Sequence, residues 1–264
     1  MTVIRAREGD EDRWDRSRRI KWMDMEKLRS SSFLVVGAGA LGNEVVKDLI
    51  LSGARKITLV DMDHVVRSNL NRCIFFREGD SEARRPKAEV VAERVRELDP
   101  SVDIDPVVGK VEDLPEDSWG EHSIVLGCLD NVAARLHVNS FSYFNMMPYI
   151  DGGTNGHAGR VQVILPPSTP CLQCGLNRSH YRILERRNSC TGTEMTYFQP
   201  KMAAEITTTA MVAAVQVREA LKIVSGRDDS IIRNVLHLNG LHNTWEVLEA
   251  SFDPLCPLHH MGHE

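Results

Sequence analysis

The sequence predicts an α/β fold: a Rossmann-like, mostly parallel sheet with helices on both faces, then a crossover loop and C-terminal strands tied by zinc. Three observations favour this fold. The apolar run 33–36 ends in a glycine-rich turn, short apolar runs alternate with helical patterns, and the second such run ends in Asp61. A strand, a glycine turn and a helix open folds of this kind. The alternation that follows favours parallel strands.

The remaining elements follow in order along the chain. After the glycine turn, Leu41, Val45 and Leu49 recur at helical spacing until Gly53. Further strands are expected at 57–60, 102–108, 123–127, 160–165, 231–238 and 244–249, and further helices at 86–98, 131–144 and 202–224. Residues 175–200 have no clear period and are expected to form a long crossover segment, the kind of loop in which function tends to lie.

The chain is expected to divide into an N-terminal helical arm, 1–32, and one large domain, 33–264. The arm is polar and rich in arginine, and its few apolar residues need another surface to pack on, which could belong to a second subunit. These residues are Trp14, Ile20, Trp22, Met25 and Leu28. The domain shows no internal linker at which it could be divided.

Composition excludes several classes of protein. A net charge of -5 argues against a general nucleic-acid binder, which would carry a basic excess. Apolar runs stay well short of the ~20 residues that a membrane helix needs, and the charged start of the chain is unlike a signal peptide. Six cysteines in a chain of this size suit thiols and metal ligands better than a disulfide framework. A cytoplasmic protein is therefore expected.

The glycine turn is the first candidate site. Gly37, Gly39 and Gly42 would let the chain turn tightly, bring backbone N–H groups to a phosphate and let the next helix pack closely. Asp61 follows at a strand end, where an acid reaches ribose hydroxyls. These four residues fit NAD as well as ATP, so a dinucleotide-dependent oxidoreductase stays open on this evidence.

Three charged residues favour a triphosphate. A nucleotide that loses pyrophosphate builds up negative charge, which needs cations and usually a metal ion. Arg72 and Lys87 would supply cations, and Asp130, at the carboxyl edge of the sheet, would supply a metal ligand. The ordinary alternatives are a solvated lysine in the first turn of a helix and an aspartate that caps the helix beginning near 132.

A second candidate site is a zinc centre. Four residues have the spacing of tetrahedral zinc ligands: Cys171, Cys174, Cys256 and His259. His260 or His263 could replace His259 as the fourth ligand. A redox role for the first cysteine pair would leave the downstream residues unexplained. Such a zinc site would be structural and would tie the end of the chain to the crossover segment.

Six segments carry a resemblance to a known family. Residues 33–174, and less closely the rest, resemble the adenylation domain of the ubiquitin-activating enzymes and of the bacterial adenylyltransferases of molybdopterin and thiamine biosynthesis. The matching segments are Val35-Val36-Gly37-Ala38-Gly39-Ala40-Leu41-Gly42, Asp61-Met62-Asp63, Ser68-Asn69-Leu70-Asn71-Arg72, Arg85-Pro86-Lys87-Ala88, Leu129-Asp130-Asn131 and Ile150-Asp151-Gly152-Gly153-Thr154. The chain departs from the family at Cys73, where glutamine is common, and at His259, because relatives usually have four cysteines.

The resemblance implies roles for individual residues. Asp61 would hold the ribose. Asn69, Arg72 and Lys87 would bind the phosphates, and Asp130 would hold magnesium. Arg16 would reach from the arm into the active site of the partner subunit, which implies a homodimer.

Cys190 is the candidate nucleophile. It lies in the crossover segment, where Arg186 and Arg187 could stabilise a thiolate. In the family, the cysteine followed by threonine in this region takes the activated protein as a thioester. Cys73 and Cys128 are expected to be buried small apolar residues, and an inert Cys190 stays open.

The implied function is ATP-dependent activation of a ubiquitin-like protein that ends in Gly-Gly. Its C-terminal carboxylate would attack the α-phosphate of ATP, and the acyl group would then pass to Cys190, with a ubiquitin-conjugating enzyme as a possible next partner. The segment 151–154, with Gly156 and Gly159, could line a groove for the tail or simply form turns. Two alternatives are an adenylyltransferase for a sulfur-carrier protein, with Cys190 idle or carrying a persulfide, and a non-catalytic scaffold.

Overall fold

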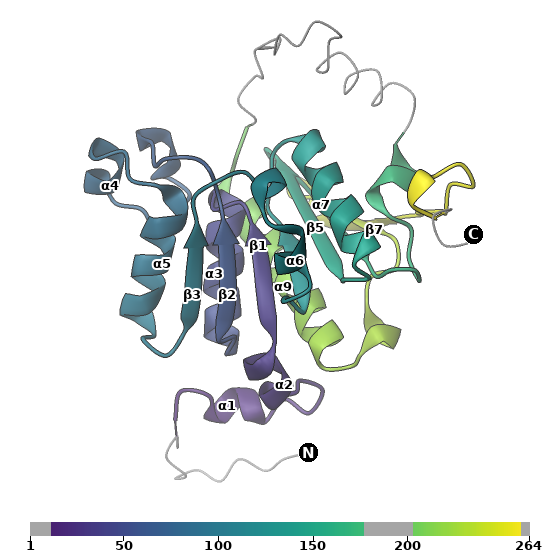
Figure 1. Ribbon diagram of the computed structural model, residues 1–264, viewed down its shortest axis with the longest axis horizontal. Helices are drawn as coiled ribbons and strands as arrows, with labels where there is room; N and C mark the ends of the chain where they lie inside the picture. Colours follow the sequence, from purple (N-terminus) through teal and green to yellow (C-terminus); the bar gives the residue numbers. More distant parts are fainter. Residues whose placement is uncertain (1–11, 177–202, 260–264) are drawn as a thin grey trace, which may run out of the picture.

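A single eight-stranded sheet organises the protein (Figure 1), as seen in a computed structural model that describes residues 12–176 and 203–259. The strand order is β3-β2-β1-β4-β5-β6-β7-β8. The strands are β1 (Ser32–Val36), β2 (Lys56–Val60), β3 (Asp103–Val107), β4 (Ile124–Gly127), β5 (Tyr149–Asn155), β6 (Ala158–Ile164), β7 (Val235–Asn239) and β8 (Thr244–Leu248). Neighbours from β3 to β5 pair in parallel, and those from β5 to β8 pair antiparallel.

Helices cover both faces of this sheet. They are α1 (Asp15–Arg18), α2 (Met25–Ser30), α3 (Ala40–Ser52), α4 (Glu78–Glu82), α5 (Lys87–Leu98), α6 (Glu116–Trp119), α7 (Val132–Phe144) and α9 (Ile206–Val224). Along β1, Phe33 and Val35 join a core shared with α3, α5 and α9, whereas Leu34 and Val36 join a second core with α6 and α7. The alternation arises because successive side chains of a strand point to opposite faces. The predicted α/β fold is confirmed.

The structure corrects the predicted elements in one important place. Strand β5 was not predicted, because Gly152 and Gly153 lower the strand propensity of its sequence. Neighbouring side chains lie close to both glycines, and most closely to Gly152. A Cβ on Gly152 would lie 2.3 Å from Oε1 of Gln216, and a Cβ on Gly153 would lie 3.1 Å from the Arg135 guanidinium. Two short helices, α4 and α6, were also not predicted, and α9 begins at Ile206 rather than at 202.

The described part of the arm packs on its own chain. Trp14, Met25 and Leu28 are buried in the core shared with α3. Met25 and Trp14 lie against Gly53, at the C-terminal end of α3, where an added Cβ would come 2.9 Å from the Met25 methyl group. These three residues therefore need no second subunit to cover them, whereas Ile20 and Trp22 are exposed. Figure 1 shows α1 and α2 at the end of the sheet where β1 begins, opposite α4.

Within residues 12–176 and 203–259, every helix is too short or too polar to cross a bilayer.

The glycine turn between β1 and α3 provides a test of the fold. A Cβ on Gly42 would lie 1.8 Å from the carbonyl oxygen of Gly37, whereas a Cβ on Gly39 would meet nothing within 4 Å. We therefore expect Gly42→Ala to destabilise the protein by about 2–3 kcal/mol through overpacking. Gly39→Ala should cost less than about 1 kcal/mol, as a change at a helix N-cap. Denaturant unfolding of both variants measures the difference, and equal midpoints would contradict this account of the turn.

Candidate nucleotide site and metal centre

The glycine turn leaves an open space at the N-terminus of α3. Gly37 has φ 102°, and its N–H donates to the Val60 carbonyl at 2.8 Å, which continues the pairing of β1 with β2 into the turn. Gly39 is the N-cap of α3, and nothing lies within 4 Å of the position that a Cβ would take. An anion placed there would face backbone N–H groups and the positive end of the helix dipole.

Asp61 is bound to the same turn. Its Oδ2 accepts from the Ala38 N–H at 2.6 Å, and its Oδ1 accepts from the Asp63 N–H at 2.7 Å. Burial raises the pKa of Asp61, and the charge of Lys87 together with the two N–H groups opposes this rise without cancelling it. The carboxylate is therefore held in one orientation beside Ala38, at the carboxyl end of β2.

The two residues expected to act together in the segment 68–72 have different environments. Asn69 is 9 % exposed, and its Oδ1 accepts from the Val66 N–H at 3.0 Å, so its side chain stabilises the local turn. Arg72 donates to Oδ1 of Asn71 at 2.9 Å and to the Ser68 carbonyl. Among the described residues, these partners of Arg72 are neutral oxygens, so its positive charge stays available to a ligand.

Lys87 has a partner that the sequence did not suggest. It is 8 % exposed, and its Nζ lies 2.8 Å from Oδ2 of Asp63. The backbone N–H of Lys87 also donates to the Asp63 carbonyl at 2.9 Å. Lys87 is therefore not the solvated lysine that was weighed as the alternative. The Asp63 side chain is 57 % exposed, so solvent reaches this ion pair from the Asp63 side.

Asp130 lies exposed just beyond β4, and the neighbouring residue caps the next helix. Asn131 is the N-cap of α7, and its Oδ1 accepts from the Ala134 N–H at 2.8 Å. The helix-capping alternative for Asp130 was therefore wrong. An exposed carboxylate at this edge has the oxygen ligands that Mg²⁺ prefers.

Asn43 is a residue of this region that the sequence analysis missed. It is fully buried in α3, and its Nδ2 donates to the carbonyls of Ala38 and Gly39 at 2.8 and 3.0 Å. Its Oδ1 accepts from the Phe75 N–H at 3.1 Å. Asn43 thus joins the glycine turn to the segment that follows Arg72. The signal available in the sequence was an asparagine in the first turn of the helix that follows the glycine turn.

Arg16 lies near the end of the sheet at which β1 begins, and the glycine turn lies at the end where β1 stops. Arg16 is exposed on α1, beside Trp14, which packs at the C-terminal end of α3. The glycine turn lies at the N-terminal end of α3 (Figure 1). The fold therefore does not bring Arg16 to the glycine turn of its own chain.

Asp151 forms the centre of a buried polar cluster next to β4. It is fully buried and accepts from Arg135 Nε at 2.8 Å, from Arg160 Nη2 at 2.8 Å and from the Tyr149 hydroxyl at 2.9 Å. Burial alone would raise the pKa of Asp151, but the two guanidinium groups hold it below its ordinary value. The segment 151–154 is therefore a strand fixed from several sides.

Three glycines of this region have close neighbours, and a groove for an extended tail stays a prediction. Gly152 and Gly153 leave room for Gln216 and Arg135. A Cβ on Gly159 would lie 2.4 Å from a methyl group of Val212.

The four expected zinc ligands meet in one cluster. The ligand atoms of Cys171, Cys174, Cys256 and His259 all lie within 4.8 Å of one another. Sγ of Cys171 is 3.8 Å from Sγ of Cys174 and 3.6 Å from Sγ of Cys256, and Sγ of Cys174 is 3.0 Å from Nε2 of His259. Two sulfurs bound to one tetrahedral Zn²⁺ at about 2.3 Å would be about 3.8 Å apart. The cluster could therefore hold a zinc ion.

His259 is oriented by a residue outside the cluster, Tyr143. The Nδ1 of His259 lies 2.7 Å from the hydroxyl of Tyr143, on α7, which leaves Nε2 directed at the sulfurs. Second partners of this kind usually fix the tautomer of a ligating histidine. His260 and His263 lie outside the described residues, as does Cys190.

The two remaining cysteines are poor nucleophiles. Burial raises the pKa of Cys73 to about 11 and that of Cys128 well above its usual range. Both thiols stay protonated at neutral pH, and a protonated thiol reacts slowly. This agrees with the prediction that the two residues act as small apolar side chains.

The metal centre generates a second prediction. We expect the purified protein to contain one zinc ion per chain and His259→Ala to lose it, whereas His260→Ala should retain it. Tyr143→Phe keeps the ligand but removes its support, so zinc affinity should fall about tenfold. Elemental analysis and chelator competition measure both effects. Full zinc in His259→Ala, with loss in His260→Ala or His263→Ala, would assign the fourth ligand to another histidine.

The sequence is 40% identical to the NEDD8-activating enzyme E1 catalytic subunit of Arabidopsis thaliana over 154 residues, which is 53% of this chain and 34% of that protein. It is 34% identical to SUMO-activating enzyme subunit 2 of Dictyostelium discoideum over 151 residues, which is 56% of this chain and 22% of that protein. The matched stretches thus span about a third or less of these relatives.

The fold is shared with E. coli MccB, whose structure with ATP superposes with a TM-score of 0.77 at 18% identity, covering 96% of this chain and 75% of MccB. At that identity the likeness concerns the fold alone. The sequence model of the ThiF family matches residues 15–258. Because this match takes in nearly the whole chain, the protein belongs to the ThiF family.

Proposed function

We propose that this protein activates a ubiquitin-like protein that ends in Gly-Gly. In the first step, an oxygen of the C-terminal carboxylate attacks the α-phosphorus of ATP, the bond between the α- and β-phosphates breaks, and pyrophosphate leaves. In the second step, the thiolate of Cys190 attacks the acyl carbonyl, a thioester forms and AMP leaves. The relatives named as NEDD8- and SUMO-activating enzymes support this class of reaction.

The observation that carries the proposal is the set of charges around the open glycine turn. Asp61 is fixed beside Ala38 for the ribose, and Gly39 leaves room for a phosphate. Asn69, Arg72 and Lys87 would bind the phosphates, and the two cations would neutralise charge as pyrophosphate leaves. Asn69 also shapes the turn before Arg72, because its Oδ1 accepts from the Val66 N–H. No general base is required, because the attacking carboxylate is already ionised at neutral pH.

Asp130 would hold Mg²⁺. The ion would supply further positive charge to the phosphates when bound. The exposed carboxylate of Asp130 fits this role because Asn131 takes over the capping of α7.

The other cysteines support Cys190 as the acceptor. Of the six cysteines, three gather with His259 in the metal cluster, and Cys73 and Cys128 have raised pKa values. Cys190 is the remaining thiol, and Arg186 and Arg187 near it in the sequence favour a thiolate. We propose that the metal cluster holds a structural zinc ion and that the protein is cytoplasmic, where free thiols persist.

We also propose a homodimer in which Arg16 reaches the nucleotide of the partner subunit. The position of α1, at the far edge of the sheet from the glycine turn, supports this arrangement. A ubiquitin-conjugating enzyme as the next acceptor stays a prediction from the resemblance.

The third prediction concerns Asp130 as a metal ligand. Asp130→Asn should lower ATP–pyrophosphate exchange, measured with the ubiquitin-like substrate, at least about a hundredfold because the metal loses its ligand. Asn131→Ala is the matched control: it should lower stability by about 1 kcal/mol but retain exchange. Exchange at the parent's rate in Asp130→Asn would remove that residue from the metal role.

Mixing Asp130→Asn with Arg16→Ala then tests the partner's contribution. If each site uses Arg16 of the partner subunit, random subunit exchange restores up to about a quarter of the parent's rate, since half of the dimers contain one intact site. No recovery on mixing, with subunit exchange demonstrated, would contradict the arrangement.

The fourth prediction concerns Cys190. With ATP, Mg²⁺ and the ubiquitin-like substrate, the parent should form a thiol-sensitive adduct, and Cys190→Ala should form none while retaining exchange. Cys190→Ser should form an adduct that resists thiols, because it is an oxygen ester. Non-reducing and reducing gels distinguish the three proteins. Exchange without any adduct in the parent would instead indicate an adenylyltransferase that does not transfer to Cys190.

A further inference from the structure

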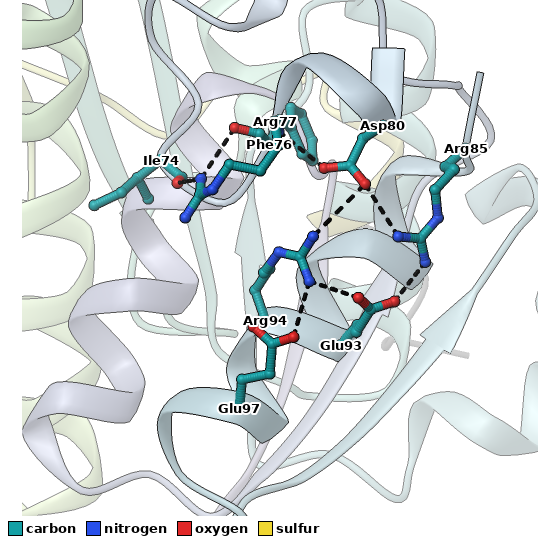
Figure 2. A network of polar contacts seen from close by, with 8 residues as sticks. All are labelled: Ile74, Phe76, Arg77, Asp80, Arg85, Glu93, Arg94 and Glu97. Carbon is teal, nitrogen blue, oxygen red and sulfur yellow. Dashed lines mark hydrogen bonds and ion pairs between the residues drawn. The ribbon is translucent and has the colours of Figure 1, made fainter. Parts of the chain in front are cut away.

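The segment between Arg72 and Lys87 is held in shape by a buried acid, Asp80. Asp80 is 4 % exposed and lies in the first turn of α4. Its Oδ2 accepts from the Arg77 N–H at 2.8 Å, and its Oδ1 accepts from Arg85 Nη1 at 3.0 Å. Arg94 Nη2, from α5, lies 3.8 Å from the same Oδ1 (Figure 2). One carboxylate therefore connects α4, α5 and the residues just before Lys87.

Further contacts tie this arrangement to both phosphate-binding residues. On the Arg72 side, Nη1 of Arg77 donates to the carbonyls of Ile74 and Phe76 at 2.8 and 3.0 Å (Figure 2). On the Lys87 side, the Arg85 N–H donates to the Asp80 carbonyl at 3.0 Å, and the Val65 N–H donates to the Arg85 carbonyl at 2.8 Å. Lys87 is two residues further along the chain, so its position depends on that of Arg85.

The charges of the network balance within it. Three arginines, at positions 77, 85 and 94, are accompanied by three acids, at positions 80, 93 and 97 (Figure 2). Arg85 Nη2 lies 2.5 Å from Glu93, and Arg94 Nη1 lies 2.5 Å from Glu93 and 2.9 Å from Glu97. The guanidinium groups of Arg85 and Arg94 thus point into the network and not toward a ligand. Arg72, outside it, pairs with neutral oxygens.

We propose that Asp80 is a positioning residue for ATP: it fixes the segment 72–87 so that Arg72 and Lys87 stand ready for the phosphates. This inference rests on the proposed function, because it takes Arg72 and Lys87 as phosphate ligands. Cations that are already in place lose less freedom when a ligand binds and stabilise charge without reorganisation. Asp80 itself stays buried among its arginines and contacts no nucleotide.

The test compares two nucleotides and four proteins. Calorimetry with Mg²⁺ gives the affinities of the parent, Asp80→Asn, Arg85→Gln and Glu219→Gln for ATP and for AMP. Glu219 is the matched control, a 2 % exposed acid on α9 that pairs with Lys222 at 2.6 Å and accepts from the Ile232 N–H at 2.8 Å. Its loss should reduce stability in a similar way but far from the segment 72–87.

We expect Asp80→Asn to bind ATP about tenfold more weakly, because small displacements of charged groups are costly, and to bind AMP as the parent does. Arg85→Gln leaves Asp80 in place and should lose less of the preference for ATP over AMP. This second variant keeps the test valid if Asp80→Asn fails to fold. Glu219→Gln should keep the parent's ratio of ATP to AMP affinity.

Two results would overturn the inference, and they are distinguishable. In the first, the parent prefers ATP over AMP and the Asp80 and Arg85 variants keep that preference, or bind both nucleotides more weakly by the same factor as Glu219→Gln does. Asp80 then has no positioning role, while the proposed function stands. If the parent itself shows no preference for ATP, the proposed function fails and the inference fails with it.

Discussion

The arrangement of the nucleotide region depends on one close backbone contact, between Gly37 and Gly42. α3 can begin directly on the end of β1 only because no side chain separates these two residues. Once α3 is placed, Ala38 presents its N–H to Asp61, and Asn43 reaches both the turn and Phe75. Three segments that are distant in the sequence are thereby held in fixed positions relative to one another. The contact is steric, and the polar interactions follow from it.

Charged residues near the carboxyl edge of the sheet fall into two groups. Asp80 and Asp151 are buried, and each is satisfied by arginines and further hydrogen-bond donors. Breaking such a buried pair leaves an uncompensated charge, so these clusters hold the backbone in one conformation. Arg72 and Asp130 are instead partly or fully exposed, and among the described residues Arg72 donates to neutral oxygens. The buried clusters hold the backbone in shape, whereas the second group reaches the surface.

The sequence predicted what is local and missed what depends on distant partners. Strands such as β1 and β4 are continuous apolar runs between turns, and they were found close to their true bounds. Strand β5 was missed because its glycines make sense only against Gln216 and Arg135, which come from other elements. The pairing of Lys87 with Asp63 spans 24 residues and leaves no periodic trace.

The same reasoning applies to the candidate sites. Motif spacing identified Gly37, Asp61 and the cysteine cluster, because their chemistry demands fixed separations along the chain. Spacing alone did not single out His259 from its neighbours, since adjacent histidines are nearly equivalent in sequence. In the structure, His259 lies in the cysteine cluster and contacts Tyr143. Asn43 and Asp80 gave no motif, because their importance lies in the segments that they join.

Helix α7 connects the two sites. It starts at Val132, directly after Asp130 and Asn131, and near its other end Tyr143 contacts His259. A helix rises by about 1.5 Å and turns by about 100° per residue, so its length fixes both a separation and an angle. Insertion of a single residue within α7 would rotate Tyr143 away from the imidazole ring while Asn131 stayed in place. The number of residues in this helix is therefore as constrained as their identity.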